Sequence, residues 1–344
     1  MVPFRPSLNR LLKKSICFVV RPALLVRVPR AVIAAIVIAS VLRCAPLEAN
    51  GLIFNYRPVF KPYYDAAGAV KIAVREFERN GASRALIVDA DSFQTGEIDA
   101  STIAFNREVE KEVWRKTPFA SALYRYTAGQ DGLIHNDGII RAEGAAPGVF
   151  LTVDLCPSKR NFDRNLFTST IGLPLKDKPI AIAVSGLWIE RHRDEFNWIA
   201  GEARSNRLSV TWVNHSYSHP YRKGIPDEKN FLLSKGVDFD KEALGLEVLL
   251  LENGLLPSPF FRFPGLVSDR RALERLRALS LIPVGADAWL AKGRMPGPGS
   301  IILVHGNGNE KRGVKKLINF YKEKKGDFKE GRLTLKPLQD AFAR

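Results

Sequence analysis

The clearest pattern in the chain lies between residues 148 and 305, where short apolar runs alternate with longer stretches of mixed polarity. The short runs have the length of buried strands, and the longer stretches space their apolar residues as amphipathic helices do. A strand-then-helix alternation predicts an α/β fold with a largely parallel sheet, either open or closed into a barrel. The predicted strands are Val149–Val153, Ile180–Val184, Leu208–Val213, Ile282–Gly285 and Ile301–Val304. The predicted helices are Leu187–Ser205, Asp240–Asn253 and Ser268–Leu279.

The region before this alternation has a different pattern of apolar and polar residues. The charge and apolar spacing of Ala66–Asn80 predicts a helix, Arg84–Asp89 has the composition of a short strand, and the glycine-rich stretch Gly129–Gly148 predicts loops. We therefore expect a small amino-terminal region of unknown role at residues 50–145. The main domain is expected at residues 146–325 and a tail at residues 326–344.

The first 49 residues have the pattern of an export signal. Arg27 and Arg30 precede the apolar run Ala31–Leu42, and small residues follow as far as Ala49. Because a membrane helix needs roughly 20 apolar residues, this run favours a removed signal over a permanent anchor. We expect an exported protein that is periplasmic or attached to the outer face of the inner membrane. An uncleaved membrane anchor remains the alternative.

Charge narrows the class of partner. The chain has a net charge of +16, and because residues 1–49 hold eight basic residues and one acidic residue, the remainder carries +9. Such a charge suits an anionic cell envelope or an acidic polymer. The basic residues are mostly interleaved with acidic ones, as on an ordinary solvated helix face, so we expect no nucleic-acid partner. Cys156 is the only cysteine after the leader, which excludes an internal disulfide there.

Chemically capable side chains follow several of the predicted strands. Asp154, His215, Asp287 and His305 come at or just after the ends of four of them. In parallel sheets the functional groups collect at the carboxyl ends of the strands. His215 and His219 have an i,i+4 spacing, which on one helical turn would place both imidazoles on one face, close enough to hold a divalent metal.

The order of these motifs resembles the NodB-homology polysaccharide deacetylase family over roughly residues 149–320. His-Ser-Tyr-Ser-His-Pro at residues 215–220 matches the family's His-(Ser/Thr)-x-x-His-Pro motif in full. Four further segments are similar to family motifs and occur in the family's order: Thr152–Pro157, Phe261–Gly265, Asp287–Trp289 and Leu303–His305. The resemblance implies a distorted (β/α) barrel with the site at its top.

The resemblance also implies roles for individual residues. His215 and His219 would be metal ligands, Asp154 the catalytic base, and His305 the general acid. Arg262 and Asp287 would be the supports that position the base and the acid. The implied activity is metal-dependent removal of N-acetyl, or O-acetyl, groups from an envelope or extracellular polysaccharide, with zinc as the expected metal.

The chain departs from the family at the third metal ligand. Leu155 stands where the family has a second aspartate, and a leucine side chain cannot coordinate a metal. Asp154, Cys156 or Asp163 could supply the missing ligand, because zinc accepts carboxylate and thiolate ligands alike; we favour Asp154. The same departure supports an alternative function, a catalytically degenerate protein of this fold that binds glycan without cleaving it. The sequence predicts no oligomeric state.

Overall fold

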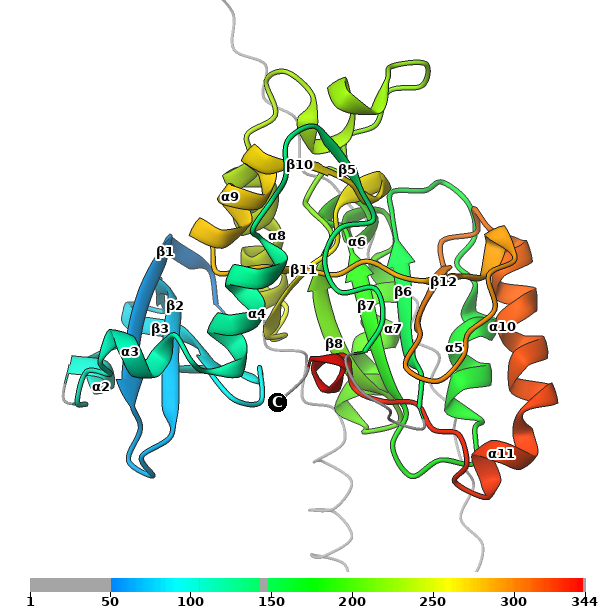
Figure 1. Ribbon diagram of the computed structural model, residues 1–344, viewed down its shortest axis with the longest axis horizontal. Helices are drawn as coiled ribbons and strands as arrows, with labels where there is room; N and C mark the ends of the chain where they lie inside the picture. The colour runs from blue at the N-terminus through cyan, green and yellow to red at the C-terminus, as the bar shows by residue number, and fades with distance from the viewer. Residues whose placement is uncertain (1–50, 105, 143–147, 343–344) are drawn as a thin grey trace, which may run out of the picture. The chain divides into compact units, whose positions relative to one another are not determined.

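The computed structural model describes residues 51–104, 106–142 and 148–342 (Figure 1). The predicted export signal or membrane anchor at residues 1–49 lies outside these residues. None of the helices within the described ranges combines the length and the apolar character that a membrane crossing requires.

Seven strands form one sheet in which every hydrogen-bonded pair is parallel. The two edge strands do not pair with each other within the described residues, so the sheet is an open, distorted barrel, and the predicted fold class is confirmed. Two neighbouring strands, Phe150–Leu155 and Pro179–Val184, are buried at every residue, as expected when both faces of a sheet are covered. From one edge to the other the strands are β11 (Ile282–Pro283), β9 (Pro257–Phe261), β8 (Ser209–Asn214), β7 (Pro179–Val184), β6 (Phe150–Leu155), β13 (Ile301–His305) and β12 (Ala288–Trp289).

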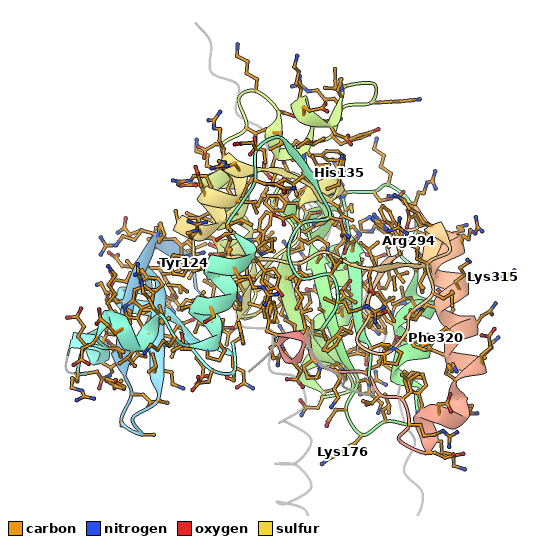
Figure 2. All side chains as sticks on the ribbon, in the orientation of Figure 1. Tyr124, His135, Lys176, Arg294, Lys315 and Phe320 are labelled. Carbon is orange, nitrogen blue, oxygen red and sulfur yellow. The ribbon has the colours of Figure 1, made fainter. Side chains whose placement is uncertain are left out.

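Helices pack against one face of this sheet and share one core cluster with it. In the helix at Lys311–Glu323 the residues Val314, Leu317 and Phe320 are spaced three apart and face the core, whereas Lys315 projects outward (Figure 2). Alternate residues of β6 enter the same cluster, Leu155 among them. The helices that follow the strands are α5 (Arg164–Ile171), α6 (Gly186–Arg191), α7 (Arg193–Arg204), α8 (Phe239–Glu252), α9 (Arg270–Ala278) and α10 (Lys311–Glu323).

The helix predicted over Leu187–Ser205 is two helices, α6 and α7, with a break at His192. The backbone at His192 has φ −125° and ψ 47°, which is outside the helical region. Its ring stacks on Trp188 at 5.1 Å, and Nε2 lies 3.0 Å from the carbonyl oxygen of Ser158. These tertiary contacts favour the break over a continuous helix.

The predicted helix at Ala66–Asn80 is wrong, because this segment contains strand β2 (Val70–Arg79). Its charged side chains pair across strands instead of along a helix face; Glu76, for example, accepts from Arg57 of the preceding strand at 2.6 Å. Asn80 and Gly81 both have positive φ and form the two-residue turn that leads into the next strand. The antiparallel sheet has the order β1 (Ile53–Tyr64), β2, β3 (Ala82–Asp89) and β4 (Thr95–Asp99), so the predicted strand at residues 84–89 is confirmed.

The residues predicted as a small amino-terminal region share a core cluster with the parallel sheet. Arg75 of β2 forms a buried ion pair with Glu247 of α8, with Nε 2.7 Å from Oε2, and Tyr56 donates to the same carboxylate. Strand β5 (Leu133–His135), within the stretch predicted as loops, pairs with β10 (Val267–Asp269). Three short helices complete this region, α2 (Ser101–Ala104), α3 (Lys111–Trp114) and α4 (Pro118–Tyr126).

The predicted tail also packs onto the parallel sheet. Helix α11 (Lys325–Lys329) buries Phe328 beside α10, and the 3₁₀ helix η5 (Leu338–Ala341) leads to Phe342. The ring of Phe342 stacks on Phe260 of β9 with centroids 5.3 Å apart. Leu338, Ala341 and Phe342 thereby join a core cluster that contains residues of the parallel sheet.

Candidate active site

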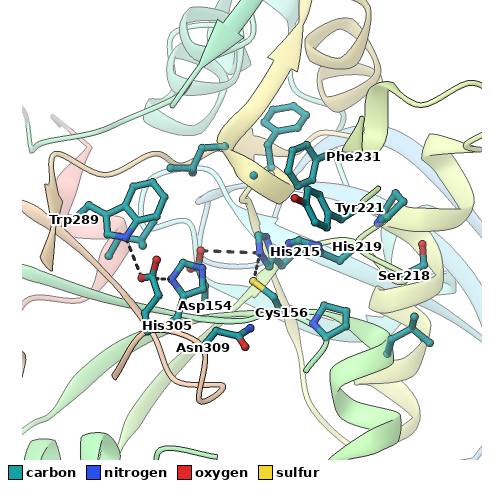
Figure 3. Close-up of a pocket in the computed structure, with 18 of the residues that line it drawn as sticks. Asp154, Cys156, His215, Ser218, His219, Tyr221, Phe231, Trp289, His305 and Asn309 are labelled. Atoms are coloured by element: carbon teal, nitrogen blue, oxygen red, sulfur yellow. Dashed lines mark hydrogen bonds and ion pairs between the residues drawn. The ribbon is translucent and has the colours of Figure 1, made fainter. Parts of the chain in front are cut away.

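A pocket of about 650 Å³ lies at the carboxyl ends of β6, β8 and β13 (Figure 3). Asp154, Cys156, His215, His219 and His305 line it. Asp154 and His305 are register partners on neighbouring strands, which places the two side chains at the same level of the sheet. The structure thus brings together four of the six predicted site residues as lining groups of a single pocket.

Asp154 is held by Arg262, as the resemblance implies. Both side chains are almost fully buried, and Nη1 of Arg262 donates to Oδ1 of Asp154 at 2.8 Å. The same guanidinium donates to the hydroxyl of Thr152 at 2.6 Å and to the carbonyl oxygen of Gly285 at 2.9 Å. Because these bonds satisfy a buried cation and fix one carboxylate oxygen, Oδ2 of Asp154 remains the oxygen directed at His215, 4.0 Å from its Nε2.

His215 is buried and oriented by its backbone neighbours. Its Nδ1 lies 2.7 Å from the carbonyl oxygen of Arg262. A carbonyl oxygen can only accept, so Nδ1 carries the proton, and Nε2 of the neutral ring presents a lone pair to the pocket. Burial lowers the pKa of His215, but the neighbouring Cys156 and Asp154 outweigh burial and raise it.

His215 and His219 do not lie on a helical turn, which corrects the sequence-based expectation. They lie in the loop after β8, where Ser216 and His219 have φ of 63° and 47°. The side chain of Asn214 accepts from the backbone N–H of Ser216 at 3.0 Å and donates to the carbonyl of Ala243 at 2.8 Å. This local turn competes with helix formation, and it still places the two rings 4.7 Å apart.

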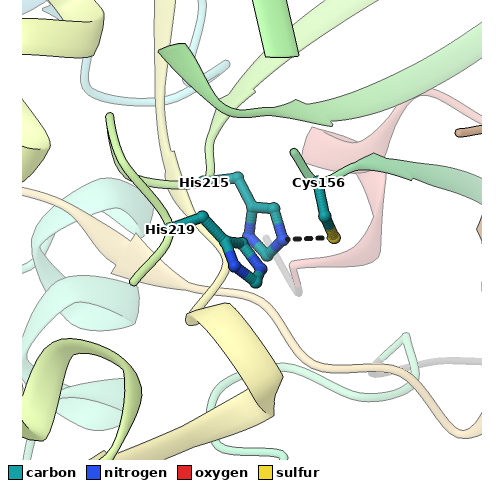
Figure 4. A group of neighbouring side chains, drawn as sticks. All are labelled: Cys156, His215 and His219. Atoms are coloured by element: carbon teal, nitrogen blue, oxygen red, sulfur yellow. Dashed lines mark hydrogen bonds between the residues drawn. The ribbon is translucent and has the colours of Figure 1, made fainter. Parts of the chain in front are cut away.

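Cys156 lies beside the histidine pair (Figure 4). Its Sγ is 3.4 Å from Nε2 of His215, and one ligand-type atom each of Cys156, His215 and His219 lies within 4.8 Å of the other two. Burial raises the pKa of the Cys156 thiol, but the charges of His219, His215 and His305 lower it well below its ordinary value. Nε2 of His219 is buried and has no hydrogen-bond partner among the residues that the structure describes.

His305 faces this group from β13 and is fixed by Glu310 (Figure 3). Nδ1 of His305 lies 2.8 Å from Oε2 of Glu310, and Nε1 of Trp289 donates to the same oxygen at 3.0 Å. Burial lowers the pKa of His305, but the neighbouring Cys156 and the bond to Glu310 raise it well above its ordinary value. Burial raises the pKa of Glu310, but the bond to His305, the charge of His305 and the bond from Trp289 together lower it below its ordinary value.

Glu310 is a site residue that the sequence analysis missed. It lies just before α10, five residues after His305, and the turn that returns it to the strand end contains Gly306 and Gly308. The available sequence signal was an acidic residue five positions after a histidine at the end of a predicted strand.

Two predicted residues lie elsewhere. Asp287 does not line the pocket; its carboxylate accepts from the backbone N–H of Ile301 at 3.0 Å and pairs with Arg141 at 2.7 Å. Glu310 instead occupies the place beside His305 that the resemblance gave to Asp287. Asp163, one of the three candidate ligands, accepts from the backbone N–H of Gly308 at 2.7 Å and is not a lining residue.

No protein-family model matches the chain. The solved structures to which it is similar include family 4 carbohydrate esterases. One from Bacillus anthracis is 17% identical with a TM-score of 0.46, over 62% of this chain and 97% of that chain. One from Bacillus subtilis is 15% identical with a TM-score of 0.45, over 69% and 90%. A family 4 pseudoenzyme from Bacillus anthracis is 14% identical with a TM-score of 0.39, over 59% and 68%. These likenesses are of fold alone.

Proposed function

We propose that this protein is a metal-dependent hydrolase that removes N-acetyl, or O-acetyl, groups from an envelope or extracellular polysaccharide. The observation that carries the proposal is the convergence of Asp154, the His215/His219 pair and His305 in one pocket. A carboxylate, two imidazoles with ring nitrogens suited to metal ligation and a separately held histidine are the groups that metal-assisted amide or ester hydrolysis needs.

The histidine pair fits a divalent metal. The proton of His215 is committed to a carbonyl through Nδ1, and Nε2 of His219 is buried without a partner, so each ring has a nitrogen suited to ligation. Imidazole ligands suit zinc, which is the metal we propose. When bound, zinc supplies a Lewis acid that polarises a carbonyl and acidifies water.

Asp154 and His305 supply the proton transfers. Oδ2 of Asp154 accepts the proton of the attacking water while Arg262 holds Oδ1. The water oxygen bonds to the acetyl carbon, the bond to the sugar nitrogen or oxygen breaks, and His305 donates its proton to that leaving atom. Acetate and the free amine or hydroxyl are the products. Glu310 keeps His305 oriented through Nδ1 and favours its protonated form.

The walls of the pocket suit a sugar ring. Trp289, Tyr221, Phe231 and Leu266 line it together with the polar groups. Aromatic faces pack against the apolar face of a sugar while the polar groups fix its orientation. The net charge of +9 after the leader suits an anionic envelope around the substrate.

The test is to purify the full chain, add zinc, and measure acetate released from N-acetylglucosamine oligomers, peptidoglycan and O-acetylated xylan. Acetate from any of them, lost in the His305→Ala variant, supports the proposal. Absence of acetate from all of them would refute the hydrolase, and absence of retained metal would refute its dependence on metal.

A second candidate function is glycan binding without cleavage. Leu155 favours it, because this residue is buried among the helices and provides no carboxylate to the pocket. That function predicts retention of an acetylated oligosaccharide by both wild type and the His305→Ala variant, with no acetate from either. Turnover by wild type would exclude it.

A further inference from the structure

We infer that Cys156 is the third protein ligand of the metal held by His215 and His219, which makes the site a Cys-His-His centre selective for thiophilic divalent ions. This inference rests on the metal dependence in the proposed function. It replaces the carboxylate ligand Asp154 that we favoured from the sequence.

The distances fit one shared ion. Zinc bonds of about 2.3 Å to sulfur and about 2.0–2.1 Å to nitrogen, arranged tetrahedrally, separate neighbouring ligand atoms by roughly 3.3–3.7 Å. Sγ of Cys156 lies 3.4 Å from Nε2 of His215. The three ligand-type atoms, with that of His219, all lie within 4.8 Å of one another, so an ion between them requires only small side-chain movements.

The alternation of strand β6 explains why Cys156 takes this place. Successive side chains of a strand point to opposite faces. Leu155 therefore enters the core on the helix side, whereas Asp154 before it and Cys156 after it both line the pocket. The amide of Asn307 donates to the carbonyl oxygen of Cys156 at 3.0 Å and fixes the backbone there.

The alternative ligands are less well placed, and neither belongs to the group of ligand-type atoms that Cys156 forms with the two histidines. Oδ1 of Asp154 accepts from Arg262, and its Oδ2 is 4.0 Å from Nε2 of His215, farther than the cysteine sulfur. Asp163 accepts from the backbone of Gly308. A thiolate ligand therefore leaves Asp154 available as the base, which a metal-bound Asp154 would not be.

A Cys-His-His site has consequences for metal choice. Thiolate ligands favour zinc, cobalt and cadmium over magnesium, calcium and manganese, which prefer oxygen ligands. Three protein ligands also leave a fourth tetrahedral position open, as in catalytic zinc sites.

The experiment is cobalt titration of the full chain after removal of metal, followed by absorption. Cys17 and Cys44 are the other two thiols of the chain, so the parent protein carries Cys17→Ser and Cys44→Ser. We expect a thiolate-to-cobalt charge-transfer band in the near ultraviolet that saturates at one cobalt per chain. Adding Cys156→Ser should abolish this band and weaken zinc binding by at least roughly a hundredfold.

The variant Cys156→Asp is the control that distinguishes loss of a metal ligand from a folding defect. It should restore zinc binding through a carboxylate while the charge-transfer band stays absent. Cobalt bound by the parent at one equivalent without the band, or a band that survives Cys156→Ser, would overturn the inference. In that case acetate release by the zinc-loaded parent would leave the proposed function standing. A Cys156-dependent band with no acetate release would uphold the ligand and refute the hydrolase.

Discussion

The two sides of the pocket differ in how completely their polar atoms are satisfied. On the histidine-pair side, formed by Cys156, His215 and His219, Nε2 of His219 is buried without a partner in the described structure. On the His305 side, formed by His305, Glu310 and Trp289, a chain of hydrogen bonds joins all three residues. The first arrangement suits the binding of an ion, and the second suits the holding of a proton. The two sides should therefore respond differently to the same kinds of change.

Metal removal should have the largest effect, because it disables the histidine-pair side. After treatment with a chelator we expect acetate release to fall by at least about 1,000-fold, since the metal stabilises transition-state charge by several kcal/mol. Zinc should restore the rate and magnesium should not. If the chelator-treated protein is shown to contain no metal and still releases acetate at its full rate, the histidine-pair side has no role as a metal site in the reaction.

Substitution of the proposed acid should come next. His305→Ala should lower kcat roughly hundredfold to thousandfold, the usual contribution of general acid catalysis. Its zinc content should equal that of wild type, because His305 is not among the residues grouped with the metal pair. The measurement compares the zinc content and the rate of acetate release of the variant with those of wild type. Loss of zinc in this variant would show instead that His305 helps to hold the metal.

Glu310→Gln should lower kcat about tenfold to hundredfold by releasing the orientation of His305. The pH profile provides a readout that a merely structural role would not move. An acid must be protonated, so activity is lost as the pH rises through the pKa of His305. The Glu310 carboxylate contributes to raising that pKa. Its removal should therefore shift the alkaline limb of the kcat profile to lower pH.

The Glu310→Asp variant is the matched control, because it keeps the charge and should keep most of the pH profile. An alkaline limb at the same pH in wild type and Glu310→Gln would show that the carboxylate does not act through His305.

Trp289→Phe should have the smallest effect. The substitution keeps an aromatic ring in the pocket wall and removes the N–H that donates to Glu310. The loss of one hydrogen bond to a charged group predicts a kcat about threefold to tenfold lower, with KM for an oligosaccharide nearly unchanged. A large rise in KM with unchanged kcat would instead assign Trp289 to substrate binding.

The strands that contain Ile180–Val184 and Ile301–Val304 were predictable, because they are buried almost throughout and are therefore continuous apolar runs. The strand within residues 66–80 was not predictable. The charged residues of β2 have partners on neighbouring strands, and their spacing along the sequence is the same as that of charges on a helix face. The turn at Asn80 and Gly81 was the local signal that would have corrected it.

Asp154 and His305 were predictable as site residues, because both lie at the carboxyl ends of strands that are visible in the sequence. The loop conformation at His215 was not predictable, because it depends on hydrogen bonds of the Asn214 side chain that residue spacing alone does not reveal. Glu310 depends on a turn that returns the chain to the strand end. The bond from Asn214 to Ala243 is tertiary, and the two turns depend on backbone geometry that a linear motif does not specify.

The most direct test of the central claim is the zinc content of the purified full chain and of its His215→Ala, His219→Ala double variant. We predict one zinc per chain in the wild type and none above background in the double variant, with both proteins shown to be folded by circular dichroism. Equal zinc in the two proteins, or none in wild type supplied with zinc, would contradict a metal centre at this pair.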